Sequence, residues 1–534
     1  MMTERSCSEI ENGVKSISQQ QQQVNHTQQQ EKACQKRKDV ANGRWRLLRD
    51  ALLQKSSSSG TPSCSIHRFK GYQLLSTVKD TSYILTQLQP SLTKFDWNCA
   101  LTLEQNLDRM EIAVLTLAAC YPKGKCLNVT HCPKQVDCDG WIATLAKRCQ
   151  PVVALVRFET KTNEASDNGS STAETTVTTT ISLLVQETSS LKTRYTFQAY
   201  PLNDSLLLFT REPNDHPRLS LQDLVSHRRN QGVDNTGNIC VWDSEKTLTY
   251  LLWNHWTDLE SHVLSSNGND LKHRSFYRPS ESFRILELGT GMAGLSAITL
   301  AMYLVQEAAA VSFQNIRQHQ IQVTLTDGNA TGVHNNKINQ YIMETYYSTL
   351  QRNNKNEETS PYHALDVTCQ QLLWTTDMEN PSTPLSSTSI PHPSNIVLIS
   401  DCVHFQNFHA SLAMTTLRNL CIGGIAIFCQ PTRGDSLSNF CRLLDAVTTT
   451  MTTTTCSGSG RDDALVQWQW WEPSILQEEH VQAKVHYSTV YDESLHRPKI
   501  LIMTKLRDMV EGDRLVLIQN HKRIQEEKHQ RQQR

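Results

Sequence analysis

Apolar residues between about positions 232 and 505 form short strand-like runs that alternate with longer helix-like stretches. The predicted strands are rich in Ile, Val and Leu, and they are Phe283–Leu288, Ile321–Thr326, Ile396–Ile399 and Gly424–Cys429. The predicted helices between them are Leu295–Gln306, His334–Tyr347 and Ser411–Leu420. Near-continuous apolar runs are typical of strands that are covered on both faces. The alternation therefore predicts an α/β fold with a doubly wound parallel sheet. Further strands, without long helices between them, are predicted at Ala464–Trp471, Val485–Val490 and Lys499–Lys505.

The flanks of this predicted domain, residues 232–510, are more polar. Residues 1–40 form a Gln- and Ser-rich arm that we expect to be disordered, because it cannot bury enough apolar surface to fold. Residues 41–231 are predicted to be an α+β accessory region with low-complexity insertions, and the Thr-rich segment 163–182 looks like an inserted loop. Residues 511–534 form a polar C-terminal tail, which is either an exposed helix or disordered.

Composition and charge narrow the classes of function. The 534 residues carry 52 Lys and Arg against 53 Asp and Glu, which excludes a globally basic nucleic-acid-binding protein. The longest apolar stretch, Leu295 to Val305, is shorter than the ~20 residues that a membrane span needs. The N-terminus is polar and shows no signal peptide. We therefore expect a soluble monomer that binds neither nucleic acid nor membrane, in the cytoplasm and with the nucleus left open as a second compartment.

Cysteine usage points to no metal site. Sixteen cysteines are too few for a disulfide scaffold, and four of them recur every six residues, at Cys120, Cys126, Cys132 and Cys138. Zinc sites usually pair their ligands within a C-x₂₋₄-C spacing, which this repeat does not match. We predict ordinary reduced thiols.

A short basic segment near the N-terminus, Arg44–Lys55, places Trp45, Leu48 and Leu52 on one helical face. A basic amphipathic helix can dock on an acidic partner such as calmodulin. It can equally pack on its own domain with a solvated basic face, and both interpretations stay open.

A glycine-rich turn follows the first predicted strand, in the string Glu287-Leu288-Gly289-Thr290-Gly291-Met292-Ala293-Gly294. Gly289 and Gly291 carry no side chain that would keep a ligand from the backbone. Glu287 would repel a pyrophosphate, and it favours a cationic ligand such as S-adenosylmethionine. The next strand ends in Asp327-Gly328-Asn329, where the acid is placed to bind a ribose diol. Together these features predict a cofactor site, with a solvated turn acid as the alternative.

A second acid, Asp401, follows the predicted strand Ile396–Ile399. Open α/β sheets bind ligands beyond the carboxyl ends of their strands, so Asp401 should face the same crevice as Gly289 and Asp327. Methyl transfer requires a neutral amine in line with the sulfonium methyl, and a carboxylate can hold that amine. A role as a strand-end cap is the alternative.

These residues resemble the seven-β-strand protein-lysine methyltransferases, and among them those that act on calmodulin. The strings that carry the likeness are Asn235–Glu245, Glu287–Gly289, Leu325–Asn329, Ser400–Cys402, Pro431–Cys441 and Leu495–Lys499, with Arg44–Arg49 and Arg68-Phe69 near the N-terminus. The likeness covers roughly residues 43–75 and 232–505 and leaves 76–231 largely outside. It implies a doubly wound, seven-stranded, Rossmann-like methyltransferase sheet.

The resemblance also implies roles for the matched residues. The implied cofactor-binding residues are Trp242, Glu287, Gly289, Gly291, Asp327, Asn329, Trp374 and Ser400. Within this set, Asp327 would bind the ribose and Trp374 would lie against the adenine. Asp401 would be the catalytic residue, and Arg433 would meet an acidic substrate. A core position for Trp242 and an exposed ion pair for Arg433 stay open, and His404 stands where the family has an aromatic residue.

The function implied by the resemblance is S-adenosylmethionine-dependent N-methylation of a calmodulin lysine, with trimethyllysine as the expected product. Two alternatives stay open. One is a methyltransferase for a lysine of another protein, and the other is a non-catalytic adaptor that binds calmodulin through Arg44–Lys55. A nicotinamide dehydrogenase is disfavoured, because Glu287 disfavours pyrophosphate.

Overall fold

The computed structural model describes seventeen parts of the chain. They are residues 75, 81–121, 124–131, 138–149, 153–162, 177–186, 195–203, 206–213, 237, 241–266, 283–310, 321–353, 361–376, 390–432, 434–448, 464–478 and 497–533. Several predicted features lie outside these residues, namely the Gln-rich arm, the basic helix at Arg44–Lys55, the strand at Val485–Val490 and the substrate contact Arg433.

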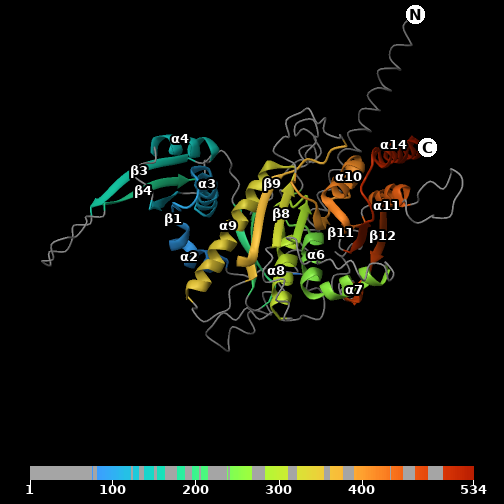
Figure 1. Cartoon of the computed structure of the whole chain (residues 1–534), viewed down its shortest axis with the longest axis horizontal. Helices are drawn as coiled ribbons and strands as arrows, with labels where there is room; N and C mark the ends of the chain where they lie inside the picture. The colour runs from blue at the N-terminus through green and yellow to red at the C-terminus, as the bar shows by residue number, and fades with distance from the viewer. Residues whose placement is uncertain are drawn as a thin grey trace, which may run out of the picture.

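A seven-stranded sheet forms the centre of the molecule (Figure 1). Its strands are β7 (Phe283–Leu288), β8 (Ile321–Asp327), β9 (Leu365–Gln371), β10 (Ser394–Ser400), β11 (Leu420–Pro431), β12 (Val466–Trp471) and β13 (Pro498–Lys505). Their spatial order is β12-β13-β11-β10-β7-β8-β9, and β13 is antiparallel to both of its neighbours while the other pairs are parallel. The predicted doubly wound, seven-stranded sheet is confirmed.

The strand order reverses between β7 and β10, which are neighbours in the sheet although β8 and β9 lie between them in sequence. Leu398 of β10 pairs with Glu287 of β7, and Ile399 pairs with Leu288. Both strands therefore end side by side at one edge. A reversal of this kind leaves a crevice beyond the carboxyl ends of the strands, because the following helices leave on opposite faces.

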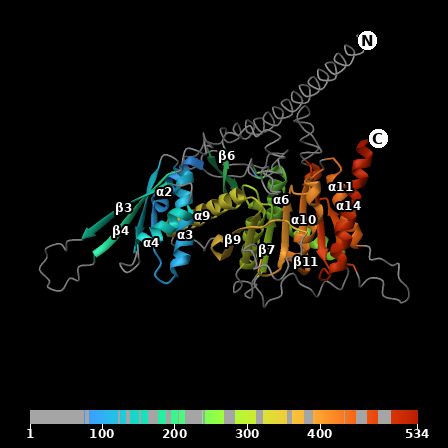
Figure 2. The same cartoon turned by 90° about the horizontal axis from the view of Figure 1, so that it is seen from above.

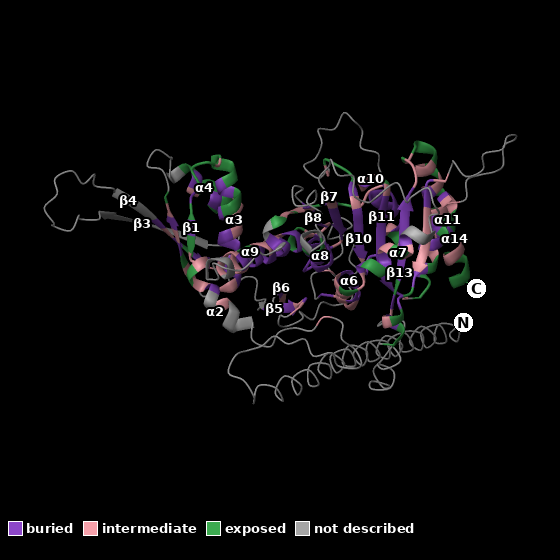
Figure 3. Cartoon of the chain, turned by 60° about the horizontal axis from the view of Figure 1, so that its bottom comes forward, coloured by how far each residue is buried: buried purple, intermediate pink, exposed green. Residues whose placement is uncertain are grey.

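Alternate residues of the central strands enter two different hydrophobic clusters. Ile285 and Leu398 belong to the cluster on one face, whereas Leu286 and Ile399 belong to the cluster on the other. Successive side chains of a strand point to opposite faces of the sheet, so both faces are apolar here. Helices cover both of them. Each buried aliphatic side chain contributes about 1.5–3 kcal/mol relative to an exposed one. Figure 3 shows the resulting buried interior of the sheet.

The helices of the first face are α6 (Asp243–Asn254), α7 (Trp256–Ser266), α8 (Leu295–Ala310) and α9 (Ala330–Asn353). Those of the second are α10 (His409–Asn419), α11 (Ser436–Thr448) and α14 (Glu511–Gln533). Two short 3₁₀ helices also occur, η4 (Pro361–Ala364) and η5 (Gln406–Phe408). No described helix is long and apolar enough to span a bilayer.

The four predicted central strands lie within observed strands, although β11 is longer at both ends than the predicted Gly424–Cys429. Phe283–Leu288 is β7 as predicted. α9 is longer than predicted, and the helix predicted to end at Leu420 stops at Asn419, because Leu420 already begins β11. The tail predicted as exposed helix or disordered is the helix α14, which packs against α10 and α11 with Leu517 and Ile524 buried.

The accessory region contains a separate four-stranded sheet at the β9 end of the central sheet (Figures 1 and 2). Its strands, β1 (Lys94–Asp96), β2 (Lys125–Thr130), β4 (Val177–Gln186) and β3 (Val153–Thr162), lie in that spatial order. Its helices are α2 (Thr81–Leu92), α3 (Leu103–Cys120) and α4 (Cys138–Arg148). The loop predicted at 163–182 is shorter than expected, because residues 177–182 belong to β4 and pair with β3.

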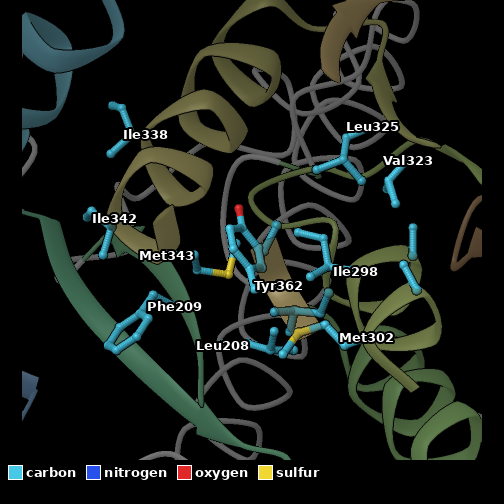
Figure 4. Packing of buried hydrophobic residues seen from close by; sticks show 14 of the residues in the cluster. Leu208, Phe209, Ile298, Met302, Val323, Leu325, Ile338, Ile342, Met343 and Tyr362 are labelled. Atoms are coloured by element: carbon cyan, nitrogen blue, oxygen red, sulfur yellow. The ribbon is translucent and has the colours of Figure 1, made fainter. Parts of the chain in front are cut away.

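A hairpin, β5 (Tyr195–Pro201) and β6 (Leu207–Pro213), joins the accessory region to α9. Figure 4 shows Leu208 and Phe209 of β6 in the same cluster as side chains of α8, β8 and α9. The Tyr347 hydroxyl of α9 donates a 2.7 Å hydrogen bond to the Leu207 carbonyl oxygen. The accessory region thus shares one continuous hydrophobic cluster with the first face of the central sheet.

Candidate active site

A cavity of about 270 Å³ lies at the carboxyl ends of β7, β8 and β10. Its walls come from the glycine turn after β7, the end of β8, the segments after β9 and β10, and the start of α6. The lining residues are Gly237, Val241, Trp242, Glu245, Gly289–Gly291, Ala293, Asp327, Gly328, Leu372–Thr375, Ser400–Cys402, His404, Phe405 and Phe408. The volume is close to the ~300 Å³ lower end of small-molecule sites.

The glycine turn requires glycine at two positions. Gly289 has φ +69°, and a Cβ there would lie 2.6 Å from the Cys402 Sγ and 3.2 Å from the Trp374 ring. Gly291 has φ +56°, and a Cβ there would lie 2.7 Å from the Gly237 carbonyl oxygen. Positive φ is costly for residues with a side chain. The turn is therefore a close-packed backbone surface at the cavity wall.

An asparagine of α9, Asn336, holds this turn from behind. Its Oδ1 accepts a 2.8 Å hydrogen bond from the Gly294 N–H, and its Nδ2 donates to the Gly291 carbonyl oxygen at 3.0 Å. Asn335 and Asn339 both donate to the Met292 carbonyl oxygen, at 2.7 and 2.9 Å. These buried amides pin the turn, and nothing in the local sequence pattern predicted their role.

Asp327 also fixes the turn. Its Oδ2 accepts from the Gly291 N–H and its Oδ1 accepts from the Asn329 N–H, both at 2.7 Å. Each carboxylate oxygen can accept further bonds, because an ionised carboxylate has about four lone-pair sites. Asp327 is thus oriented by the backbone and presents its carboxylate at the cavity. Asn329 takes part through its backbone and does not line the cavity.

Two buried glutamates bind the N-terminal turn of α8. Glu245 Oε1 accepts hydrogen bonds from the Ser296 N–H at 2.8 Å and from the Ser296 hydroxyl at 2.9 Å. Glu287 Oε2 accepts from the Ala297 N–H at 2.8 Å. The Ser400 hydroxyl donates to Glu245 Oε2. Helix N-termini attract anions, and here the protein's own carboxylates occupy that position.

Burial raises the pKa of both glutamates, because desolvation disfavours the charged form. The pKa of Glu287 lies well above its usual range, since the neighbouring Glu245 carboxylate adds to the effect of burial. As a carboxylate, Glu287 Oε1 would find no hydrogen-bond donor among the described residues. Protonated Glu287 instead donates to Glu245. The larger rise at Glu287 favours the proton on Glu287 over Glu245, and Glu245 is the member of the pair that lines the cavity.

This arrangement disfavours an anionic ligand. In dinucleotide-binding folds the helix N-terminus after the glycine turn receives the pyrophosphate. Here Glu245 and Glu287 fill that position, and Asp327 and Asp401 add further carboxyl groups at the cavity. A cationic ligand is favoured by the same charges.

Asp401 has an unusual backbone conformation, with φ +51°, and its side chain is 5% exposed. A non-glycine residue in this region costs about 1–3 kcal/mol and persists only where its surroundings hold it. The Asp401 N–H donates to the Cys429 carbonyl oxygen at 3.0 Å, and Gln430 bridges the Ile399 carbonyl and the Val403 N–H. The tight turn carries Asp401 directly off β10 into the cavity wall.

Aromatic side chains form much of the remaining wall. Trp374 lies over Gly289, and Trp242 precedes the first residue of α6. Phe405 and Phe408 are in edge contact, with ring centroids 6.5 Å apart. Beneath the glycine turn, burial raises the pKa of the Cys402 thiol well above its usual range, so it stays protonated and is a poor nucleophile.

The sequence-predicted site residues meet at this cavity with three exceptions. Those that line it are Trp242, Gly289, Gly291, Asp327, Trp374, Ser400 and Asp401. Glu287 lies behind the wall, Asn329 beside it, and Arg433 outside the described residues. Sequence reasoning assigned no role to Glu245, Phe405 or Phe408. Glu245 lies in the string Asn235–Glu245 that carried the family likeness, and its place in that string was the one sequence feature that could have marked it as a site residue.

Comparisons with known proteins add one sequence relative. No protein-family model matches the chain. The chain is similar to the calmodulin-lysine N-methyltransferase of Arabidopsis thaliana, with 27% identity over 218 residues, which covers 40% of this chain and 52% of that protein. The chain thus spans about half the length of the curated relative it matches.

Solved structures give only faint similarity. The plantazolicin methyltransferase BpumL in complex with SAH is 12% identical and covers 49% of this chain and 95% of its own, with a TM-score of 0.22. An rRNA methylase from Streptococcus thermophilus is 9% identical and covers 44% of this chain and 95% of its own, with a TM-score of 0.19.

Proposed function

We propose that this protein is an S-adenosylmethionine-dependent protein-lysine N-methyltransferase and that its substrate is calmodulin. One observation carries the proposal: a glycine turn, a ribose-type acid and a strand-end acid meet at one cavity whose helix N-terminus is filled by the protein's own glutamates. That combination suits a cationic adenosyl ligand and disfavours a pyrophosphate.

The residues present fit the cofactor. A ligand can lie against the backbone of Gly289 and Gly291, where a Cβ would clash. Asp327 would bind the ribose hydroxyls, with a charged hydrogen bond of this kind contributing about 1.5–3 kcal/mol. Trp374 would stack on the adenine, and the Glu245 charge would face the cationic methionine end. When bound, S-adenosylmethionine supplies an electrophilic methyl group on a sulfonium.

Asp401 would hold the substrate lysine. Its carboxyl group lies at the end of β10 beside Gly289 and Ser400 in the same cavity. A carboxylate here would orient the amine and stabilise the positive charge on the methylated product. In the overall reaction a lysine ammonium and a sulfonium yield a methylated ammonium, a thioether and a proton. Orientation of the two reactants can supply up to about 7–11 kcal/mol of the barrier.

Calmodulin as the substrate is supported by the likeness to the Arabidopsis enzyme of that name and by the specific strings Asn235–Glu245 and Pro431–Cys441. Arg433 lies within the second string and would meet an acidic partner. We propose trimethyllysine as the product, on the same resemblance.

The decisive experiment incubates the purified full chain with methyl-labelled S-adenosylmethionine and unmethylated calmodulin, and maps the label by mass spectrometry. We expect label on one calmodulin lysine. Asp401→Asn is the matched control, because it keeps the size of the side chain and removes its charge. Label on another protein of a cell lysate but not on calmodulin would refute the substrate. Absence of label on every protein, with calmodulin retained by a peptide of residues 44–55, would instead support the adaptor.

A further inference from the structure

His404 lies in the cavity wall three residues after Asp401, and its side chain is 24% exposed. Its Nδ1 lies 2.7 Å from the Asp401 carbonyl oxygen and 3.5 Å from the Asp401 Oδ1. The ring also packs on Phe405, with centroids 3.7 Å apart. These contacts fix the orientation of the imidazole.

The contact with the Asp401 carbonyl decides which ring nitrogen carries the proton. A carbonyl oxygen only accepts hydrogen bonds, so Nδ1 must be the donor. The neutral ring then has its lone pair on Nε2. This contact engages Nδ1 and leaves the lone pair of Nε2 available. No hydrogen bond to Nε2 forms within the part of the chain that the structure describes.

The proposed reaction needs such an acceptor. A lysine side chain has an ordinary pKa of about 10.4, so it arrives as an ammonium, and only the free amine can attack a methyl group. A neutral imidazole is a stronger base than a carboxylate, and it is the general base that enzymes use most often. An imidazole is therefore the better acceptor for the ammonium proton.

We propose that His404 is a catalytic residue whose Nε2 takes the proton from the substrate lysine, an inference that rests on the proposed lysine methylation. The N–H bond of the ammonium breaks, its electron pair stays on the lysine nitrogen, and the proton bonds to Nε2. The imidazolium formed keeps its Nδ1–H on the Asp401 carbonyl, with the Asp401 carboxylate 3.5 Å away to stabilise the charge. The proton then leaves to solvent.

The groups packed around this loop suit the role. Burial lowers the pKa of His409, at the start of α10, to about 4, so this second histidine stays neutral. From α14, His521 binds the Gln406 carbonyl oxygen at 2.8 Å and Lys528 donates to Gln406 Oε1 at 2.6 Å. Those contacts lie on the side of the loop that faces α14, while Asp327, Asp401 and Glu245 are the acidic groups at the cavity wall.

The test compares the parent with His404→Gln, which can still donate to the Asp401 carbonyl but cannot take up a proton. His392→Gln is the matched control, because His392 is exposed and does not line the cavity. We expect His404→Gln to lower kcat toward calmodulin about 100-fold near neutral pH. Its affinity for S-adenosylhomocysteine should stay within about twofold, because the lost step involves only the lysine. The deficit should shrink as pH rises, since more lysine is already the free amine.

A second measurement does not depend on activity. The ¹⁵N NMR signals of the His404 ring, assigned by their loss in His404→Gln, should show a neutral ring protonated at Nδ1. An unchanged kcat, a deficit that is the same at every pH, or a ring protonated at Nε2 would each overturn the inference. A parent enzyme that methylates no lysine would overturn the proposed function and this inference with it, whereas an active parent with an equally active His404→Gln overturns the inference alone.

Discussion

Replacing Glu287 by Gln should make folding stability less sensitive to alkaline pH. Glu287 is 1% exposed, and burial together with the neighbouring Glu245 carboxylate raises its pKa well above the usual range. In the unfolded chain the same carboxyl group ionises near its ordinary value of about 4.3. Because burial raises its folded pKa, the folded state binds more protons than the unfolded state above that value. Stability is therefore full below the ordinary pKa and is lost as pH rises toward the raised one.

The size of this change in pH dependence follows from the number of protons that folding takes up, which is one for Glu287. Between the unfolded and folded pKa values, the loss is about 1.4 kcal/mol for each pH unit. A Gln at position 287 imitates the protonated acid, since its Oε1 can accept from the Ala297 N–H and its Nε2 can donate to Glu245. From about pH 6 to about pH 8 the variant should therefore lose up to about 3 kcal/mol less stability than the parent.

Urea unfolding followed by tryptophan fluorescence at the two pH values measures the difference. Glu472→Gln is the control, because Glu472 is exposed and its replacement should leave the pH dependence unchanged. An equal loss of stability in the parent and in Glu287→Gln would refute the shared proton.

Three further substitutions test the cavity and its surroundings. Gly289→Ala should destabilise the fold by at least about 1–3 kcal/mol and weaken the binding of S-adenosylhomocysteine. The reason is that φ is positive at this position and the new Cβ would clash with the Cys402 Sγ. Unchanged thermal stability and affinity would contradict this. Asp327→Ala should weaken binding of the same ligand about 10- to 100-fold by calorimetry, and unchanged affinity would refute the ribose role. Leu517 of α14 is fully buried, so Leu517→Ala should lower the free energy of unfolding in urea by about 2–5 kcal/mol. A loss near zero would contradict a stabilising role for the packing of α14.

The sequence predicted the central strands well because their signal is local. β7 is bounded by the glycine turn and is buried at five of its six positions, so its Phe, Ile and Leu residues mark it although Arg284 and Glu287 interrupt them. β9 at the sheet edge is only partly buried, and its polar residues hid it from the same criterion. The helix α11 was also missed, although Leu437, Phe440 and Leu444 recur at helical spacing, a pattern that predicts an amphipathic helix.

The site was predictable only where a residue type and its place at a strand end were enough. Gly289, Asp327 and Asp401 follow strands that meet at one edge, so topology brings them together. The pairing of Glu245 with Glu287 depends on α6 packing beside α8, which no local pattern encodes. Glu287 was predicted to act on the ligand directly, whereas the structure places it behind Glu245.

The measurement that tests the account most directly is a single turnover with unmethylated calmodulin. Excess full-length protein is mixed with calmodulin and S-adenosylmethionine, quenched over time, and analysed for both products by mass spectrometry. The account predicts that S-adenosylhomocysteine appears in step with methyl groups on one calmodulin lysine, and that Asp401→Asn slows both together. Formation of neither product by the parent, with the cofactor bound, would contradict it.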